Sequence, residues 1–113
     1  MKKWEEAMYA VIYRWRVKPD DEAEFQQRWH KGTNDIAANY GGGGSRLHKT
    51  DNGEWVAYAR WPAKTERDKV RAARLNLNAH EKGKGELIEE TWLRITDDLL
   101  IPEAELPERF RKG

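Results

Sequence analysis

The sequence contains no cysteine among its 113 residues. Disulfides and zinc sites built on thiolates are therefore excluded, and nothing indicates an oxidising compartment. The chain also lacks any apolar run long enough to cross a bilayer, and its first residues lack the apolar stretch of a signal peptide. We therefore expect a cytoplasmic protein that is not bound to a membrane.

An excess of either charge sign is missing too. The chain has 21 Lys and Arg against 20 Asp and Glu, which gives a formal net charge of +1. A general electrostatic attraction to nucleic acid is thus not expected. Hydrophobic residues make up only 38% of the chain, but they include six Trp and four Tyr. At this length we expect one domain with a modest core, in which large aromatic residues serve the core or an interface.

One stretch, Glu54–Pro62, organises the rest of the chain. It follows an Asn-Gly pair, which is a strong hairpin signal, and it alternates between two faces as a strand does. One face carries Trp55, Ala57, Ala59 and Trp61, and the other carries Val56, Tyr58 and Arg60. Because both faces hold apolar or aromatic residues, the pattern predicts a central strand that is covered on both sides.

Three further strands are predicted, over residues 8–17, 45–50 and 87–96. The second is short and carries only Leu47 as a strongly apolar residue, which is typical of an edge strand. Simple alternation in the last strand places Leu87 on one side, with Ile88, Trp92 and Arg94 on the other.

Two helices are predicted between these strands. Apolar residues at spacings of three and four indicate a helix from Asp20 or Asp21 to Tyr40, and the flexible run Gly41–Gly44 ends it. A second helix begins near Thr65. Its apolar stripe is expected to hold Val70, Ala73, Leu77 and His80, with Arg67, Lys69, Arg71 and Arg74 toward solvent.

The predicted order is strand, helix, strand, strand, helix, strand. This is the α+β, split βαβ or ferredoxin-like plan, with a four-stranded antiparallel sheet and two helices. We expect an arm over residues 1–7, the domain over 8–96 and an apolar tail over 97–113 that docks on the domain or on a partner subunit. Since two helices cover only one sheet face, we expect a second identical subunit to cover the other.

Four stretches give the chain a family resemblance. They are Tyr9–Val17, Lys18–Glu22 with the helix that follows, Gly44–His48, and Tyr58–Pro62 leading into the second helix. Together they resemble the antibiotic-biosynthesis-monooxygenase group of the dimeric α/β-barrel superfamily, over residues 8–96. The resemblance implies a homodimer with its sheets face to face and a pocket in each subunit. Some members oxidise anthrone-type aromatics with oxygen and without metal or flavin. Others degrade haem, and many have no established activity.

A cofactor-free oxygenase needs an apolar pocket for a flat aromatic and polar groups that stabilise a substrate anion. We predict His48, Tyr58 and Arg60 as catalytic residues, with His48 as the acid–base group because histidine titrates near neutrality. The predicted substrate-binding residues are Arg14, Trp61, Trp92 and Arg94. No cofactor or metal is predicted. The alternative is that the aromatics are core residues, the arginines are paired surface or dimer charges, and His48 is an exposed edge-strand residue. Which face of Tyr58–Trp61 lines the interior stays open.

Other interpretations fit less well. His80 could match the iron ligand of haem-degrading relatives, but the Trp and Asn that accompany that ligand are missing here. The glycine run ends a helix, whereas a phosphate-binding loop leads into one. The RNA-recognition motif shares the topology, but its strand signature is absent from Glu54–Trp61. Two functions remain: a small cofactor-independent monooxygenase for a flat aromatic or quinol-type substrate, or a non-catalytic dimeric barrel with a binding, structural or stress-related role.

Overall fold

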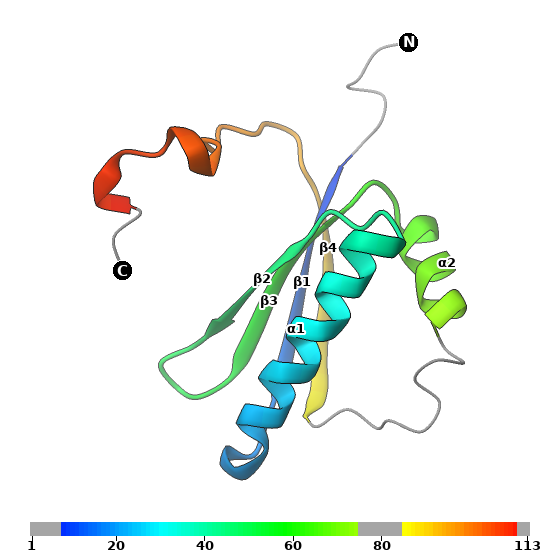
Figure 1. The fold of residues 1–113 in the computed structure, drawn as a ribbon, viewed down its shortest axis with the longest axis vertical. Coiled ribbons are helices and arrows are strands. Elements are labelled where there is room, and N and C mark those ends of the chain that lie inside the picture. Colours follow the sequence, from blue (N-terminus) through cyan, green and yellow to red (C-terminus); the bar gives the residue numbers. More distant parts are fainter. Residues whose placement is uncertain (1–7, 75–84, 111–113) are drawn as a thin grey trace.

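The computed structural model describes residues 8–74 and 85–110. A four-stranded antiparallel sheet carries two helices on one face (Figure 1). The strands are β1 (Tyr9–Arg16), β2 (Ser45–Lys49), β3 (Trp55–Trp61) and β4 (Glu86–Arg94), and the helices are α1 (Glu22–Asn39) and α2 (Lys64–Arg74). The spatial order β2-β3-β1-β4 makes β3 and β1 central and β2 an edge strand. The predicted ferredoxin-like α+β fold is thereby confirmed.

The core lies between the sheet and the helices. Val11 of β1 and Ala59 and Trp61 of β3 are buried there, and Ile36 of α1 and Val70 of α2 pack against them. A second cluster joins Val17, Phe25 and Trp55. The odd-numbered residues of β1 and β3 therefore point toward the helices, since side chains alternate along a strand.

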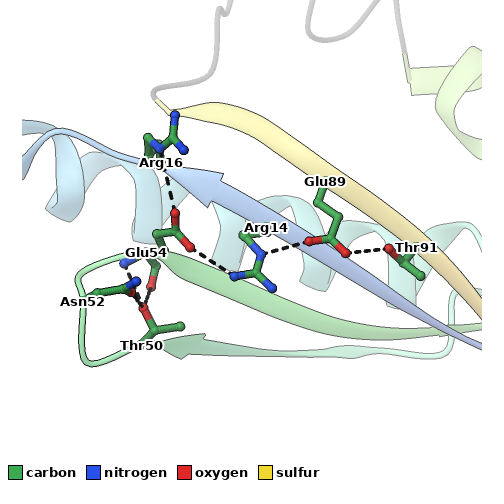
Figure 2. A network of polar contacts seen from close by, with 7 residues as sticks. All are labelled: Arg14, Arg16, Thr50, Asn52, Glu54, Glu89 and Thr91. Carbon is green, nitrogen blue, oxygen red and sulfur yellow. Dashed lines mark hydrogen bonds and ion pairs between the residues drawn. The ribbon is translucent and has the colours of Figure 1, made fainter.

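The opposite sheet face, here called the far face, is partly apolar. Ile12, Val56 and Tyr58 lie on it and are half-buried in the single chain. Its charges form the network of Figure 2, in which Arg14 donates to Glu54 at 3.1 Å and to Glu89 at 3.0 Å. Exposed ion pairs of this kind contribute little stability, but this one joins the turn before β3 to β1 and β4.

The strand β4 departs from simple alternation. Arg14 of β1 pairs with Glu89, but the next residue, Trp15, pairs with Leu87. This β-bulge at Ile88 turns Leu87 to the helix side, where Trp92 also packs. The prediction that Leu87 and Trp92 face opposite sides of the sheet is therefore wrong.

The helix α2 turns part of its basic face inward. Arg67, predicted to face solvent, is only 5% exposed, and Arg74 is half-buried. Ala73, predicted on the apolar stripe, is exposed. The reason is spacing. Val70 and Arg74 lie three and seven positions after Arg67, so the three side chains share one face of the helix. The predicted positions Leu77 and His80 lie outside the described residues, as does the arm over residues 1–7.

The tail leaves the end of β4 and extends away from the sheet (Figure 1). Two short 3-10 turns, Glu103–Glu105 and Glu108–Phe110, are its regular structure. Four of its large apolar residues are exposed, from 54% for Ile101 to 86% for Leu99, whereas Leu106 is half-buried. Docking of the tail on the domain or on a partner subunit stays a prediction. Across residues 8–74 and 85–110, no helix has the length and apolar character needed to cross a membrane.

Candidate functional site

A cavity of about 380 Å³ lies between the helices and the helix-facing side of the sheet. We call it the helix-side cavity. Aromatic rings form much of its lining, from Tyr13 and Trp15 on β1, Trp29 on α1 and Trp61 on β3. Its volume falls in the range of small-molecule sites, roughly 300–1,000 Å³. Flat indole and phenol surfaces of this kind favour a flat, largely apolar ligand.

The glycine run after α1 forms part of the cavity wall. Gly42, Gly43 and Gly44 all line it. A Cβ on Gly43 would lie 2.8 Å from the backbone oxygen of Arg60, so no larger residue fits there without movement. The guanidinium of Arg60 in turn donates to the Gly43 carbonyl at 2.8 Å. The run expected as a flexible connection is therefore closely packed against the end of β3.

One buried arginine dominates the polar part of the cavity. Arg67 donates to the Tyr13 hydroxyl at 3.1 Å, and its guanidinium contacts Glu90 at 2.7 Å and Asp68 at 3.0 Å. It also lies over the Trp92 ring, 5.2 Å from the centroid. The Trp92 indole N–H donates to Glu90 at 2.7 Å. Burial of this cation is tolerated because each of its three guanidinium nitrogens has an acceptor and the group lies over a ring face.

The protonation states of this group follow from its contacts. Burial raises the pKa of Tyr13, although the neighbouring Arg67 opposes the shift. Burial alone would lower the pKa of Arg67, but its hydrogen bonds to Glu90 and Asp68 raise it above its ordinary value. For Glu90, burial raises the pKa, and the bonds from Arg67 and Trp92 more than reverse this. At neutral pH the group thus holds a neutral phenol, a guanidinium cation and a carboxylate.

The direction of the Tyr13 proton is set by Arg67. A guanidinium has no acceptor, so the Tyr13 oxygen must accept in their shared hydrogen bond. The phenol proton then points elsewhere, and within the described part of the chain the Tyr13 hydroxyl makes no second hydrogen bond. Because Tyr13 lines the cavity, its O–H is available to a ligand oxygen.

The predicted catalytic residues do not gather at this cavity. Arg60 lines it, but His48 and Tyr58 lie on the far face, where register pairs His48 with Val56 and Tyr58 with Ile12. His48 is exposed, and its Nδ1 lies 3.0 Å from the Val56 carbonyl oxygen.

The predicted substrate-binding residues also divide between the two faces. Trp61 is buried and lines the cavity, and Trp92 packs on the helix side beneath Arg67. Arg14 belongs to the far-face network, and Arg94 is exposed at the end of β4, opposite Tyr9.

Sequence reasoning missed Tyr13 and Arg67 as site residues. Tyr13 could have been found, because it alternates with Val11 and Trp15 on one face of β1. Arg67 lies three residues before Val70, which was the available signal for its inward direction. Among residues 8–74 and 85–110, no three His, Asp or Glu side chains gather as metal ligands would.

Comparison with protein-family models and with curated proteins gave no match. Two solved structures are similar in fold. Rv0793 from Mycobacterium tuberculosis superposes with a TM-score of 0.64 and 22% identity, over 82% of this chain and 99% of that one. NE2512 from Nitrosomonas europaea, a protein of unknown function, superposes with a TM-score of 0.58 and 16% identity, over 86% of this chain and 97% of that one. At such identities the likeness establishes the ferredoxin-like α+β fold and does not extend to activity.

Proposed function

We propose that this protein is a small cofactor-independent monooxygenase that acts on a flat aromatic or quinol-type substrate in the helix-side cavity. The observation that carries the proposal is the Arg67–Tyr13 pair on the wall of an aromatic cavity. The pair supplies a fixed positive charge and an available O–H at one point. Such preorganised donors stabilise the anion that a cofactor-free oxygenation must form.

The reaction proposed for an anthrone-type methylene proceeds through the substrate anion. The substrate loses a proton to solvent, and the Tyr13 hydroxyl, polarised by Arg67, donates to the enolate oxygen. The anion transfers its electrons to molecular oxygen, and a carbon–oxygen bond forms to give a peroxide. The peroxide then takes a proton from solvent. Loss of the second methylene proton and cleavage of the oxygen–oxygen bond then leave one oxygen atom in the ketone, and the other leaves as hydroxide, which is protonated to water.

The proposal includes a homodimer formed through the far face. Ile12, Val56 and Tyr58 are half-buried there in the single chain, and both α1 and α2 lie on the other side of the sheet. A two-fold-related copy of the same face would cover them, because an isologous interface pairs each patch with itself. The paired charges of Arg14, Glu54 and Glu89 would then lie in or beside the interface.

The alternative function is a dimeric barrel that binds a small molecule without converting it. It is favoured by the placement of His30 and His48, neither of which lines the cavity, so no imidazole of the described residues is a proton acceptor there. Under this alternative the cavity binds the same flat ligand and the Arg67–Tyr13 pair serves recognition alone.

Oxygen labelling separates the two functions. Chelator-treated protein is supplied with anthrone under ¹⁸O₂, and oxygen uptake is compared with spontaneous oxidation in buffer. The proposal predicts accelerated uptake that the chelator does not lower, with one labelled atom in the ketone product. Uptake at the spontaneous rate, with ligand binding intact, would favour the non-catalytic barrel.

A further inference from the structure

Arginines line one wall of the helix-side cavity. Arg67, Arg71 and Arg74 come from successive turns of α2, and Arg60 lies near the glycine run. No aspartate or glutamate from the described ranges belongs to the lining. Most of the remaining lining is aromatic, aliphatic or glycine. The polar lining is thus largely of one charge sign.

The carboxylates that neutralise these arginines are fewer than the arginines. Asp35 lies 2.9 Å from Arg74, Glu90 lies 2.7 Å from Arg67, and Asp68 lies 3.0 Å from Arg67. Arg60 instead donates to the neutral carbonyl of a glycine. Glu90 therefore faces two guanidinium groups, and its short contact is with Arg67 and not with Arg71. The positive charge of Arg71 borders a cavity whose apolar walls weaken screening by water.

Arg71 is the arginine best placed to bind a ligand. Its guanidinium lies 3.8 Å from the Glu90 carboxylate, beyond hydrogen-bond distance, and its side chain is 57% exposed. Arg67 and Arg74, in contrast, hold hydrogen bonds that a ligand would have to break. Arg71 can turn its donors toward a ligand without losing such a bond.

We infer that the cavity selects an aromatic carboxylate, a monoanion whose charged group is bound by Arg71 and whose ring lies among the cavity's aromatic side chains. This inference rests on the proposed site and adds the charge of its substrate. The planar guanidinium fork of arginine binds a carboxylate through two parallel hydrogen bonds. Arg71 is then a specificity-determining residue, distinct from the Arg67–Tyr13 pair at which the chemistry is proposed.

Two probes of nearly equal shape test the inference. 2-Naphthoate and 2-naphthamide share their ring system, but only the first is charged. Binding is followed by tryptophan fluorescence, because Trp29 and Trp61 line the cavity. We expect wild-type protein to bind 2-naphthoate at least about tenfold more tightly than 2-naphthamide, and added salt to weaken the binding of 2-naphthoate alone.

Variants of α2 locate the charge effect. Arg71→Gln should bring the two affinities within about threefold of each other, and Arg71→Lys should restore part of the preference because it keeps the charge without the fork. The matched control is Lys69→Gln. It removes one positive charge from the same helix, but Lys69 is 77% exposed at its side chain and does not line the cavity. The preference should survive in this control.

The inference is overturned if wild-type protein binds both probes equally, binds neither, or keeps its preference in Arg71→Gln. Oxygen uptake with anthrone and with an anthrone carboxylate, measured on the same preparations, separates its failure from that of the proposed function. Uptake without a charge preference overturns the inference alone. A charge preference that Arg71→Gln removes, without oxygen uptake, supports the inference and overturns the monooxygenase proposal alone.

Discussion

At the scale of single residues, Arg67 joins two strands and a helix around the helix-side cavity. Its side chain is 6% exposed, and its partners come from β1, β4 and its own helix. Removing one member of a buried ion pair is costly because the remaining charge stays buried without compensation. The same arginine orients the Tyr13 hydroxyl, so stability and the proposed chemistry depend on one side chain.

A double-mutant cycle measures this dependence. Arg67→Met should lower the free energy of unfolding by about 3 kcal/mol, because Glu90 is then left largely buried without its cation. Adding Glu90→Gln should recover part of the loss, since the remaining group is neutral. Urea denaturation of the four proteins gives the coupling energy. Additive losses in the two single variants would contradict the assigned pairing.

The glycine run shows how an element can both end a helix and wall a cavity. Gly42 approaches the side chain of Ile36, and Gly43 approaches the backbone of Arg60. These close approaches bring the end of α1 against the end of β3 and leave no room for a side chain. The run therefore fixes the distance between two walls of the helix-side cavity.

Two alanine substitutions test this description of the run. Gly43→Ala should cost about 1–3 kcal/mol and weaken ligand binding, because its Cβ would lie 2.8 Å from the Arg60 carbonyl oxygen. Gly32→Ala is the control, since the nearest atom to its Cβ is a flexible Arg74 nitrogen at 3.6 Å. Within α1 this second change should stabilise the protein by about 0.5–1 kcal/mol. Thermal unfolding of both variants provides the measurement, and equal effects would refute the packing argument.

The elements differ in how far the sequence predicts them. Glu54–Pro62 could be placed at the centre of the sheet because its two faces are both apolar and a hairpin signal precedes it. The bulge at Ile88 could not be predicted, since register depends on the partner strand and not on local pattern. The inward direction of Arg67 follows from its spacing to Val70, but its acceptors Tyr13 and Glu90 lie on distant strands, and only the fold brings them together.

At the scale of the whole molecule, the predicted site residues and the observed cavity lie largely on opposite faces of the sheet. The predicted residues His48, Tyr58 and Arg14 lie there, and the helix-side cavity lies across the sheet from them. In the proposed dimer, far-face residues serve the interface, and the cavity of each subunit stays on its own helix side. Tyr58 and Tyr13, on neighbouring strands, then have different roles.

Dimerisation through the far face can be tested by light scattering. Wild-type protein should have the mass of two chains, and Val56→Glu should have the mass of one, because a half-buried apolar residue of the interface becomes charged. Ala73→Glu on the exposed side of α2 serves as the control and should leave the dimer intact. A wild-type monomer, or a Val56→Glu dimer, would disprove this interface.

The most direct test of the account compares the two tyrosines by oxygen uptake with anthrone. Tyr13→Phe removes the hydroxyl that accepts from Arg67 in the cavity, and Tyr58→Phe removes one from the far face. We expect a loss of about 100-fold in Tyr13→Phe, the size of effect seen when one preorganised donor is removed. We expect a rate near wild type in Tyr58→Phe. Full activity in Tyr13→Phe, or loss confined to Tyr58→Phe, would place the chemistry outside the helix-side cavity and contradict the proposal.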